Sequence, residues 1–192
     1  MKLARTSLLV LGIQLALVSS IAAKYLYQRN TCPRVWTRAV AYDPEMLMRG
    51  RYLSMQLKID ACGITLPIAK EQSKDSFEHR VIFEFDGSGT YETQLPIIVA
   101  AKNGKLVAER IAPSPHEHRS QDLILNQNAA CSEAALQVPV DFYLSETAKS
   151  PFPLAKGTEL WVEVTVPPAG PPRPIGLAIK SSDGTWQPLN YR

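Results

Sequence analysis

The sequence lacks the short motifs that position a nucleophile or a phosphate group in many enzymes. It contains no Gly-x-Ser-x-Gly, no Walker loop and no Gly-x-Gly-x-x-Gly. Catalytic groups also converge from distant positions in a chain, so this absence lowers the expectation of an enzyme without excluding one. We therefore expect a non-enzymatic protein with no metal and no cofactor, and a hydrolase with dispersed catalytic residues is the weakest alternative.

A strong excess of charge is also missing from most of the chain. The 21 basic and 18 acidic side chains give a net charge of +3, but Lys2 and Arg5 belong to an apolar first segment. Setting these two aside leaves 19 basic and 18 acidic side chains. A near-neutral domain has no electrostatic footprint for nucleic acid, so we expect no nucleic-acid partner.

Cysteine is scarce, and its spacing excludes two common sites. Cys32, Cys62 and Cys131 include no C-x-x-C pair, which excludes a zinc knuckle and a thioredoxin-type redox motif. Outside the cytoplasm one pair would form a disulfide, and we favour Cys62 with Cys131 because both lie within the folded part. That bond would close a loop of about 70 residues and leave Cys32 without a disulfide partner. Pairing of Cys32 with Cys62, and three reduced thiols, are the alternatives.

The first segment is almost uncharged. Residues 6–27 give about 22 positions, and about 20 are needed for a helix to span the hydrocarbon core. Tyr25 and Tyr27 would lie at the interface, where amphipathic rings are favoured. We expect an uncleaved anchor over residues 1–29 and one domain over residues 30–192. A signal peptide cleaved after Ala22 or Ala23 is the alternative, and a buried core helix is the least favoured reading.

Strand signals dominate the remainder of the chain, and no long amphipathic helix is indicated. Proline outnumbers glycine by 15 to 10, which favours short strands and rigid connections. About nine short strands are predicted: residues 53–60, 81–85, 96–101, 106–110, 123–125, 138–144, 160–166, 175–180 and a segment from Trp186. Asn103-Gly104 predicts a type I′ hairpin turn, and Pro139 predicts an edge strand. Residues 129–137 and 145–150 are the candidates for short helices.

This pattern predicts a mainly β domain, an antiparallel sandwich or barrel with one or two short helices, after one apolar helix. Residues 165–174 are rich in proline and are read as a stiff connection, not as a domain linker. His116 and His118 would point the same way on an extended segment, but we expect an exposed loop and no metal site, because no third ligand is recognisable. Trp161 and Trp186 are read as sheet-face or core residues, not as ligand platforms.

Residues 43–52, with the sequence DPEMLMRGRY, are the most distinctive stretch. Asp43-Pro44 predicts a turn, and Gly50 permits a backbone geometry closed to other residues as the next strand begins. Arg49 and Arg51 would present two guanidinium groups to an anionic ligand or pair locally with acidic neighbours, and we favour the pairing. Tyr52 opens the alternating strand on its polar face.

This stretch resembles the uncharacterised bacterial family named for a Gly-Asp-Tyr-x-x-Leu-x-Tyr motif. The order of a membrane segment, a short strand at residues 35–42, Asp43-Pro44 and Arg49-Gly50 before Tyr52 is similar to that family. Gly50 and Tyr52 match its motif. Arg51, Met55 and Leu57 replace its Asp, Leu and last Tyr, and residues 65–130 match nothing in it. The resemblance implies a membrane-anchored protein and implies no known activity.

We therefore expect a single-pass protein of a bacterial inner membrane, with its C-terminal domain in the periplasm or outside the cell. Secretion after signal cleavage is the alternative location. The function that we expect is an interaction module for an integral membrane protein. A periplasmic binding domain for a small ligand or glycan is the alternative function.

Overall fold

A computed structural model describes residues 2–42, 52–64, 82–85, 91–110, 121–126, 129–145 and 148–191. The chain divides into two compact units, Met1–Cys32 and Pro33–Arg192, which are considered separately below.

The first unit is one long helix, α1 (Lys2–Thr31), which continues four residues beyond the predicted end at Tyr27. Its segment Ser7–Thr31 is long and apolar enough to cross a membrane, and none of its apolar window is buried in the protein. At 1.5 Å per residue these 25 residues extend about 37 Å, against a hydrocarbon core of about 30 Å. The hydroxyl of Ser20 donates to the carbonyl oxygen of Leu17 at 2.8 Å, which satisfies this polar group within the helix. The helix fits a membrane anchor or a signal sequence.

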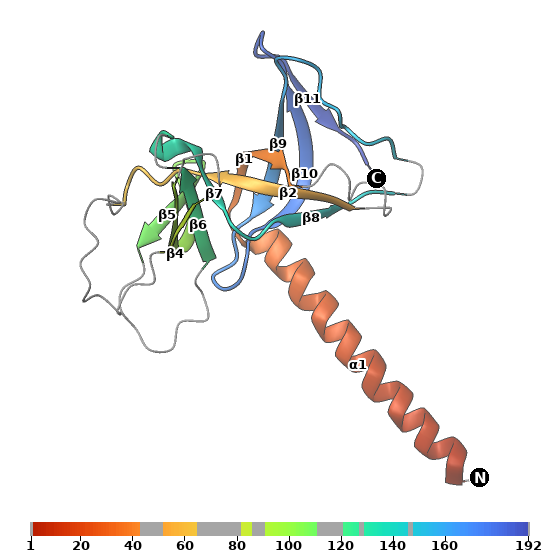
Figure 1. Cartoon of the computed structure of the whole chain (residues 1–192). Helices are drawn as coiled ribbons and strands as arrows, with labels where there is room; N and C mark the ends of the chain where they lie inside the picture. Colours follow the sequence, from red (N-terminus) through yellow and green to blue (C-terminus); the bar gives the residue numbers. More distant parts are fainter. Residues whose placement is uncertain are drawn as a thin grey trace, which may run out of the picture. The chain divides into compact units, whose positions relative to one another are not determined.

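The second unit is one curled antiparallel sheet (Figure 1). The described strands are β1 (Arg34–Ala41), β2 (Tyr52–Ile59), β3 (Ile82–Phe85), β4 (Tyr91–Lys102), β5 (Lys105–Arg110), β6 (Gln121–Asn126), β7 (Ala134–Leu136), β8 (Val140–Tyr143), β9 (Glu159–Thr165), β10 (Arg173–Lys180) and β11 (Trp186–Leu189). They follow the order β11-β10-β9-β1-β2-β7-β6-β4-β3, with β5 also paired to β4 and β8 also paired to β2. The predicted mainly β, antiparallel fold after one apolar helix is confirmed.

Strand β2 lies where the two halves of this sheet meet. One of its edges pairs with β1, and the other pairs with β8 near its start and with β7 at its end. Leu53, Met55, Leu57 and Ile59 are buried, as the predicted period of two requires. The sheet then curls back, because Asp60 after β2 receives the N–H of Ala108 and donates its own N–H to Leu106, both at 2.9 Å. The path from β2 through β7, β6, β4 and β5 therefore returns to the end of β2.

The hairpin between β4 and β5 has the predicted turn. Asn103 and Gly104 have φ values of 50° and 73°, the positive values that a type I′ turn needs at both central positions. Strand β4 begins at Tyr91, five residues earlier than predicted. The edge position predicted from Pro139 also holds, since β8 pairs with β2 alone among the described strands.

Two local predictions were wrong in part. Residues 129–137 were a helix candidate, but only Cys131–Glu133 form a 3₁₀ turn, η2, and Ala134–Leu136 form β7. The tertiary partners decide this, because β7 is buried between β2 and β6. The stiff connection predicted at residues 165–174 is shorter than expected. Arg173 and Pro174 already belong to β10 and pair with β9, and a bulge follows them.

The second helix candidate, residues 145–150, is not helical at residues 148–150. The N–H of Ala148 donates to the carbonyl oxygen of Ser145 at 3.0 Å, which closes a single turn. Residues 146 and 147 lie outside the described part.

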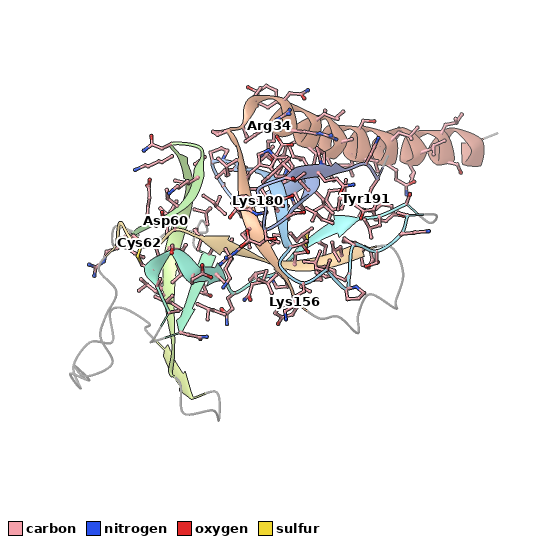
Figure 2. All side chains as sticks on the ribbon, turned by 90° about the horizontal axis from the view of Figure 1, so that it is seen from above. Arg34, Asp60, Cys62, Lys156, Lys180 and Tyr191 are labelled. Carbon is pink, nitrogen blue, oxygen red and sulfur yellow. A yellow bond between two sulfur atoms is a disulfide. The ribbon has the colours of Figure 1, made fainter. Side chains whose placement is uncertain are left out.

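A disulfide joins Cys62 to Cys131, the pair favoured from the sequence. Their Cα atoms are 4.9 Å apart, and Cys32 is a free thiol. Figure 2 shows the bond at Cys62 near Asp60, whose carboxylate receives the N–H of Cys62 at 3.0 Å. The bond ties the turn after β2 to η2 across a separation of 69 residues.

Removal of this bond should destabilise the domain. In the chain-entropy model a loop of this length contributes about 4 kcal/mol, so Cys62→Ser with Cys131→Ser should lower the free energy of unfolding by about that amount. Urea titrations of the full chain in detergent, followed by tryptophan fluorescence, measure the difference. Cys32→Ser is the matched control and should change stability by less than about 0.5 kcal/mol. Equal stabilities of the double variant and the control would contradict the assignment.

Candidate functional site

The outward face of the sheet half formed by β8, β2, β1, β9, β10 and β11 carries the site. In β1 the side chains of Val35, Thr37 and Ala39 are buried, so Trp36 and Arg38 lie on the opposite face. Arg38 pairs in register with Trp161 of β9, and Trp36 pairs with Glu163. Paired residues share a face, which brings the aromatic and charged side chains of distant strands together.

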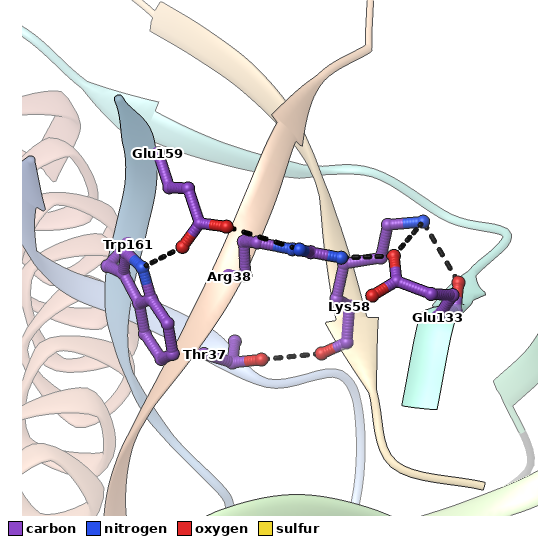
Figure 3. A network of polar contacts seen from close by, with 6 residues as sticks. All are labelled: Thr37, Arg38, Lys58, Glu133, Glu159 and Trp161. Atoms are coloured by element: carbon purple, nitrogen blue, oxygen red, sulfur yellow. Dashed lines mark hydrogen bonds and ion pairs between the residues drawn. The ribbon is translucent and has the colours of Figure 1, made fainter. Parts of the chain in front are cut away.

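Arg38 is the centre of a chain of polar contacts (Figure 3). Its guanidinium binds the carboxylate of Glu133 through Nη2 and that of Glu159 through Nη1, the latter at 3.3 Å. The other oxygen of Glu159 receives the indole N–H of Trp161 at 3.1 Å. Lys58 Nζ donates to the main-chain oxygen of Glu133 at 2.9 Å and lies 3.8 Å from its carboxylate. The chain of contacts thus links β9, β1, η2 and β2.

Arg38 supplies this network with a permanent positive charge. Burial lowers the pKa of Arg38, but hydrogen bonds and Coulombic attraction from Glu133 and Glu159 outweigh that effect, and the pKa of Arg38 is raised above its usual value. A guanidinium of this kind stays protonated at every pH at which the protein is folded. Arg38 therefore orients its two carboxylates and cannot serve as an acid or a base.

The disulfide places Glu133 for this contact. Glu133 is the last residue of η2, which begins at Cys131, and its N–H donates to Ala130 at 2.8 Å. The N–H of Ala61 also donates to the main-chain carbonyl oxygen of Cys131 at 3.1 Å. The short turn is thus held at one end by the disulfide and at the other by Arg38 and Lys58.

The three tryptophans of the chain gather on the same face. Trp186 of β11 lies edge-on to Trp36, with ring centroids 5.1 Å apart and an interplanar angle of 85°. Its centroid is 5.4 Å from that of Trp161, and Lys180 Nζ lies 5.3 Å from the Trp161 ring. The absence of a side chain at Gly176 leaves space for Glu163 and Trp36. A Cβ at this position would lie 3.3 Å from the Glu163 carboxylate and 3.8 Å from the Trp36 ring.

A cleft of about 330 Å³, which we name the Arg38 cleft, runs along this face. Its lining consists of two indoles, six charged side chains and four further residues: Trp36, Trp161, Arg38, Lys58, Lys105, Asp60, Glu133, Glu159, Thr37, Ile59, Leu106 and Ser132. Ligand sites typically measure about 300–1,000 Å³ and combine aromatic walls with a few polar groups. The Arg38 cleft lies at the lower end of that range and fits a small ligand.

A second feature of the same face is an aromatic patch, the tyrosine surface, formed by Val40, Tyr42, Tyr52 and Tyr143. Tyr52 pairs in register with Tyr143, with ring centroids 6.2 Å apart. All four are at least 47% exposed. Large side chains that stay exposed side by side on a sheet mark a binding surface more often than isolated ones do.

Among the residues that the sequence singled out, Tyr52 takes part in the tyrosine surface. Asp43, Pro44, Arg49, Gly50 and Arg51 lie outside the described residues, and so do His116 and His118. The resemblance to the Gly-Asp-Tyr-x-x-Leu-x-Tyr family therefore stays a prediction. Trp161 and Trp186 are sheet-face residues, as expected, but they also form the tryptophan cluster.

The sequence analysis did not identify Arg38, Lys58, Glu133 or Glu159 as site residues. The alternation of residues 35–42 was the available signal, because it places Trp36 and Arg38 on one face. The partners of Arg38 are 95 and 121 residues away, so only the strand order reveals the network.

No family model, no curated protein and no solved structure matches this chain.

Replacement of Arg38 by methionine should measure the strength of the network. It leaves the carboxylates of Glu133 and Glu159 without the guanidinium that lies between them, so the free energy of unfolding should fall by about 1 kcal/mol. In 1 M salt, where the Debye length is about 3 Å, at least half of this loss should disappear. Urea titrations at low and high salt measure both values.

Lys102→Met is the matched control for this substitution. Lys102 forms one exposed ion pair with Glu109 at 2.7 Å, and its loss should cost less than about 0.5 kcal/mol. An Arg38→Met variant as stable as Lys102→Met would show that the network contributes nothing beyond an ordinary surface pair.

Proposed function

We propose that α1 is an uncleaved anchor in a bacterial inner membrane and that the β domain is a non-enzymatic interaction module on the periplasmic side. The observation that carries this proposal is the exposure of α1. Leu8, Leu17, Val18 and Ile21 are each at least 55% exposed, and none of the apolar window is buried. Water strongly disfavours so long an apolar surface, whereas a bilayer accommodates it.

The disulfide supports the compartment. Cysteine pairs persist in oxidising surroundings such as the periplasm and are rare in the cytoplasm, where thiols are kept reduced. The Cys62–Cys131 bond fixes the turn that carries Glu133, so its formation bears directly on the geometry of the outward face.

The tyrosine surface supports a protein partner. Tyrosine is enriched at protein interfaces because its ring supplies apolar contact area while its hydroxyl keeps a polar bond. Tyr52 and Tyr143 are 56% and 62% exposed, although neither side chain is needed in the core. An anchored domain meets other membrane proteins at a high effective concentration, so a modest surface suffices for association. An integral membrane protein is the partner class that fits this arrangement.

Site-specific photo-cross-linking tests the proposal. A benzophenone amino acid at Tyr143 of the full chain should cross-link to an integral membrane protein in intact cells. The same group at Lys156, an exposed residue outside the tyrosine surface, is the matched control and should give no such adduct. Immunoblotting and mass spectrometry of the adducts provide the readout.

Exchange of α1 for a cleavable signal provides the second arm of this experiment. The adduct at Tyr143 should then fall at least tenfold, because the tether no longer raises the local concentration. Equal adducts at Tyr143 and Lys156, or adducts to soluble proteins alone, would contradict the proposal.

A further inference from the structure

The Arg38 cleft joins an aromatic wall to a polar floor. Trp36 and Trp161 form the wall, and Trp186, which lies outside the lining, packs edge-on against Trp36 and at a tilt of 57° against Trp161. Such edge contacts hold aromatic rings in a fixed orientation and add to the area that they bury. The wall is therefore preorganised, and a ligand that stacks there has little ordering cost to overcome.

The charges of the cleft balance within the lining. Three are basic (Arg38, Lys58 and Lys105) and three are acidic (Asp60, Glu133 and Glu159). Arg38 contacts both glutamates, Lys58 lies 3.8 Å from Glu133, and Lys105 lies 3.9 Å from Asp60. A charged ligand that bound any of these six side chains would break one of the ion pairs and would then lie beside the displaced partner, which carries the same sign of charge as the ligand. The cleft therefore favours a ligand without net charge.

The paired carboxylates still have capacity for hydrogen bonds. Glu159 uses one oxygen for Arg38 and the other for Trp161, while Glu133 contacts both of its cations through Oε2. A carboxylate has about four lone-pair positions, so hydroxyl groups of a ligand can donate to both residues without displacing the cations. The partly exposed side chains of Glu133 and Glu159, at 41% and 42%, allow this approach.

We propose that the Arg38 cleft binds a neutral saccharide. A pyranose ring presents weakly positive C–H groups on its face, which suit the negative face of an indole, and hydroxyl donors on its rim, which suit carboxylates. The ring stacks on Trp36 or Trp161, and its hydroxyl groups donate to Glu133 and Glu159. This site is separate from the tyrosine surface, and its binding of a saccharide does not depend on whether that surface binds a protein.

Equilibrium binding to the purified full chain tests this inference. The chain is held in a zwitterionic detergent, because a detergent with a sugar headgroup would compete. Cellotriose and the trimer of N-acetylglucosamine are the neutral probes, and the trimer of galacturonic acid is the charged one. Two of the three tryptophans line the cleft and the third packs against both of them, so intrinsic fluorescence reports occupancy. The neutral probes should give a saturable change that the charged probe does not.

Two variants locate the binding. Trp161→Ala should raise the Kd at least tenfold because the stacking ring is lost. Glu159→Gln, a partly exposed and fold-preserving change, should raise it about fivefold because a charged acceptor becomes a neutral one. Tyr143→Ala on the tyrosine surface is the control and should leave the Kd unchanged. Near-ultraviolet circular dichroism shows that each variant is folded.

The outcomes are distinct. Saturable binding of a neutral probe that is weakened by Glu159→Gln and unaffected by Tyr143→Ala supports the site. No saturable change with either neutral probe, tighter binding of the charged probe, or equal weakening by Tyr143→Ala would overturn it. Loss of the Tyr143 cross-link concerns the protein partner alone, so the two proposals fail separately.

Discussion

The alternating burial of β2 is the constraint on which the rest of the domain depends. Leu53, Met55, Leu57 and Ile59 are at most 1% exposed, and the same strand pairs with β1 on one edge and with β8 and β7 on the other. A shift of one residue would turn all four side chains to solvent, so the register is fixed. The fixed register also determines the outward face, where Tyr52 meets Tyr143 and Lys58 meets Glu133.

The outward face thus carries two features that the core does not require. The tyrosine surface lies where β8, β2 and β1 meet, and the Arg38 cleft lies over β1, β9 and η2. The cleft depends on a short turn that the disulfide ties to the end of β2. The proposed compartment and the site are linked in this way, because a disulfide of this kind persists in oxidising surroundings and also secures the position of Glu133.

The elements predicted well from the sequence are those specified by local pattern. Period-two alternation gave β2 and β9, Asn103-Gly104 gave the β4–β5 hairpin, and an uncharged run gave α1. The failures have tertiary causes. Strand β7 was read as helix because its partners β2 and β6 lie far away in the chain. The tryptophan cluster and the Arg38 network were not predicted for the same reason. Strands β1, β9 and β11 are far apart in the sequence, and only the strand order of the sheet brings them close together.

The central claim is that an uncleaved first helix holds the folded domain on the far side of a membrane. A C-terminal epitope on the full chain, in spheroplasts treated with external protease, tests it most directly. The account predicts an uncleaved chain in the membrane fraction whose epitope is lost on protease treatment of intact spheroplasts. An epitope that is protected until the spheroplasts are lysed, or a full-length chain that stays soluble without lipid, would contradict it.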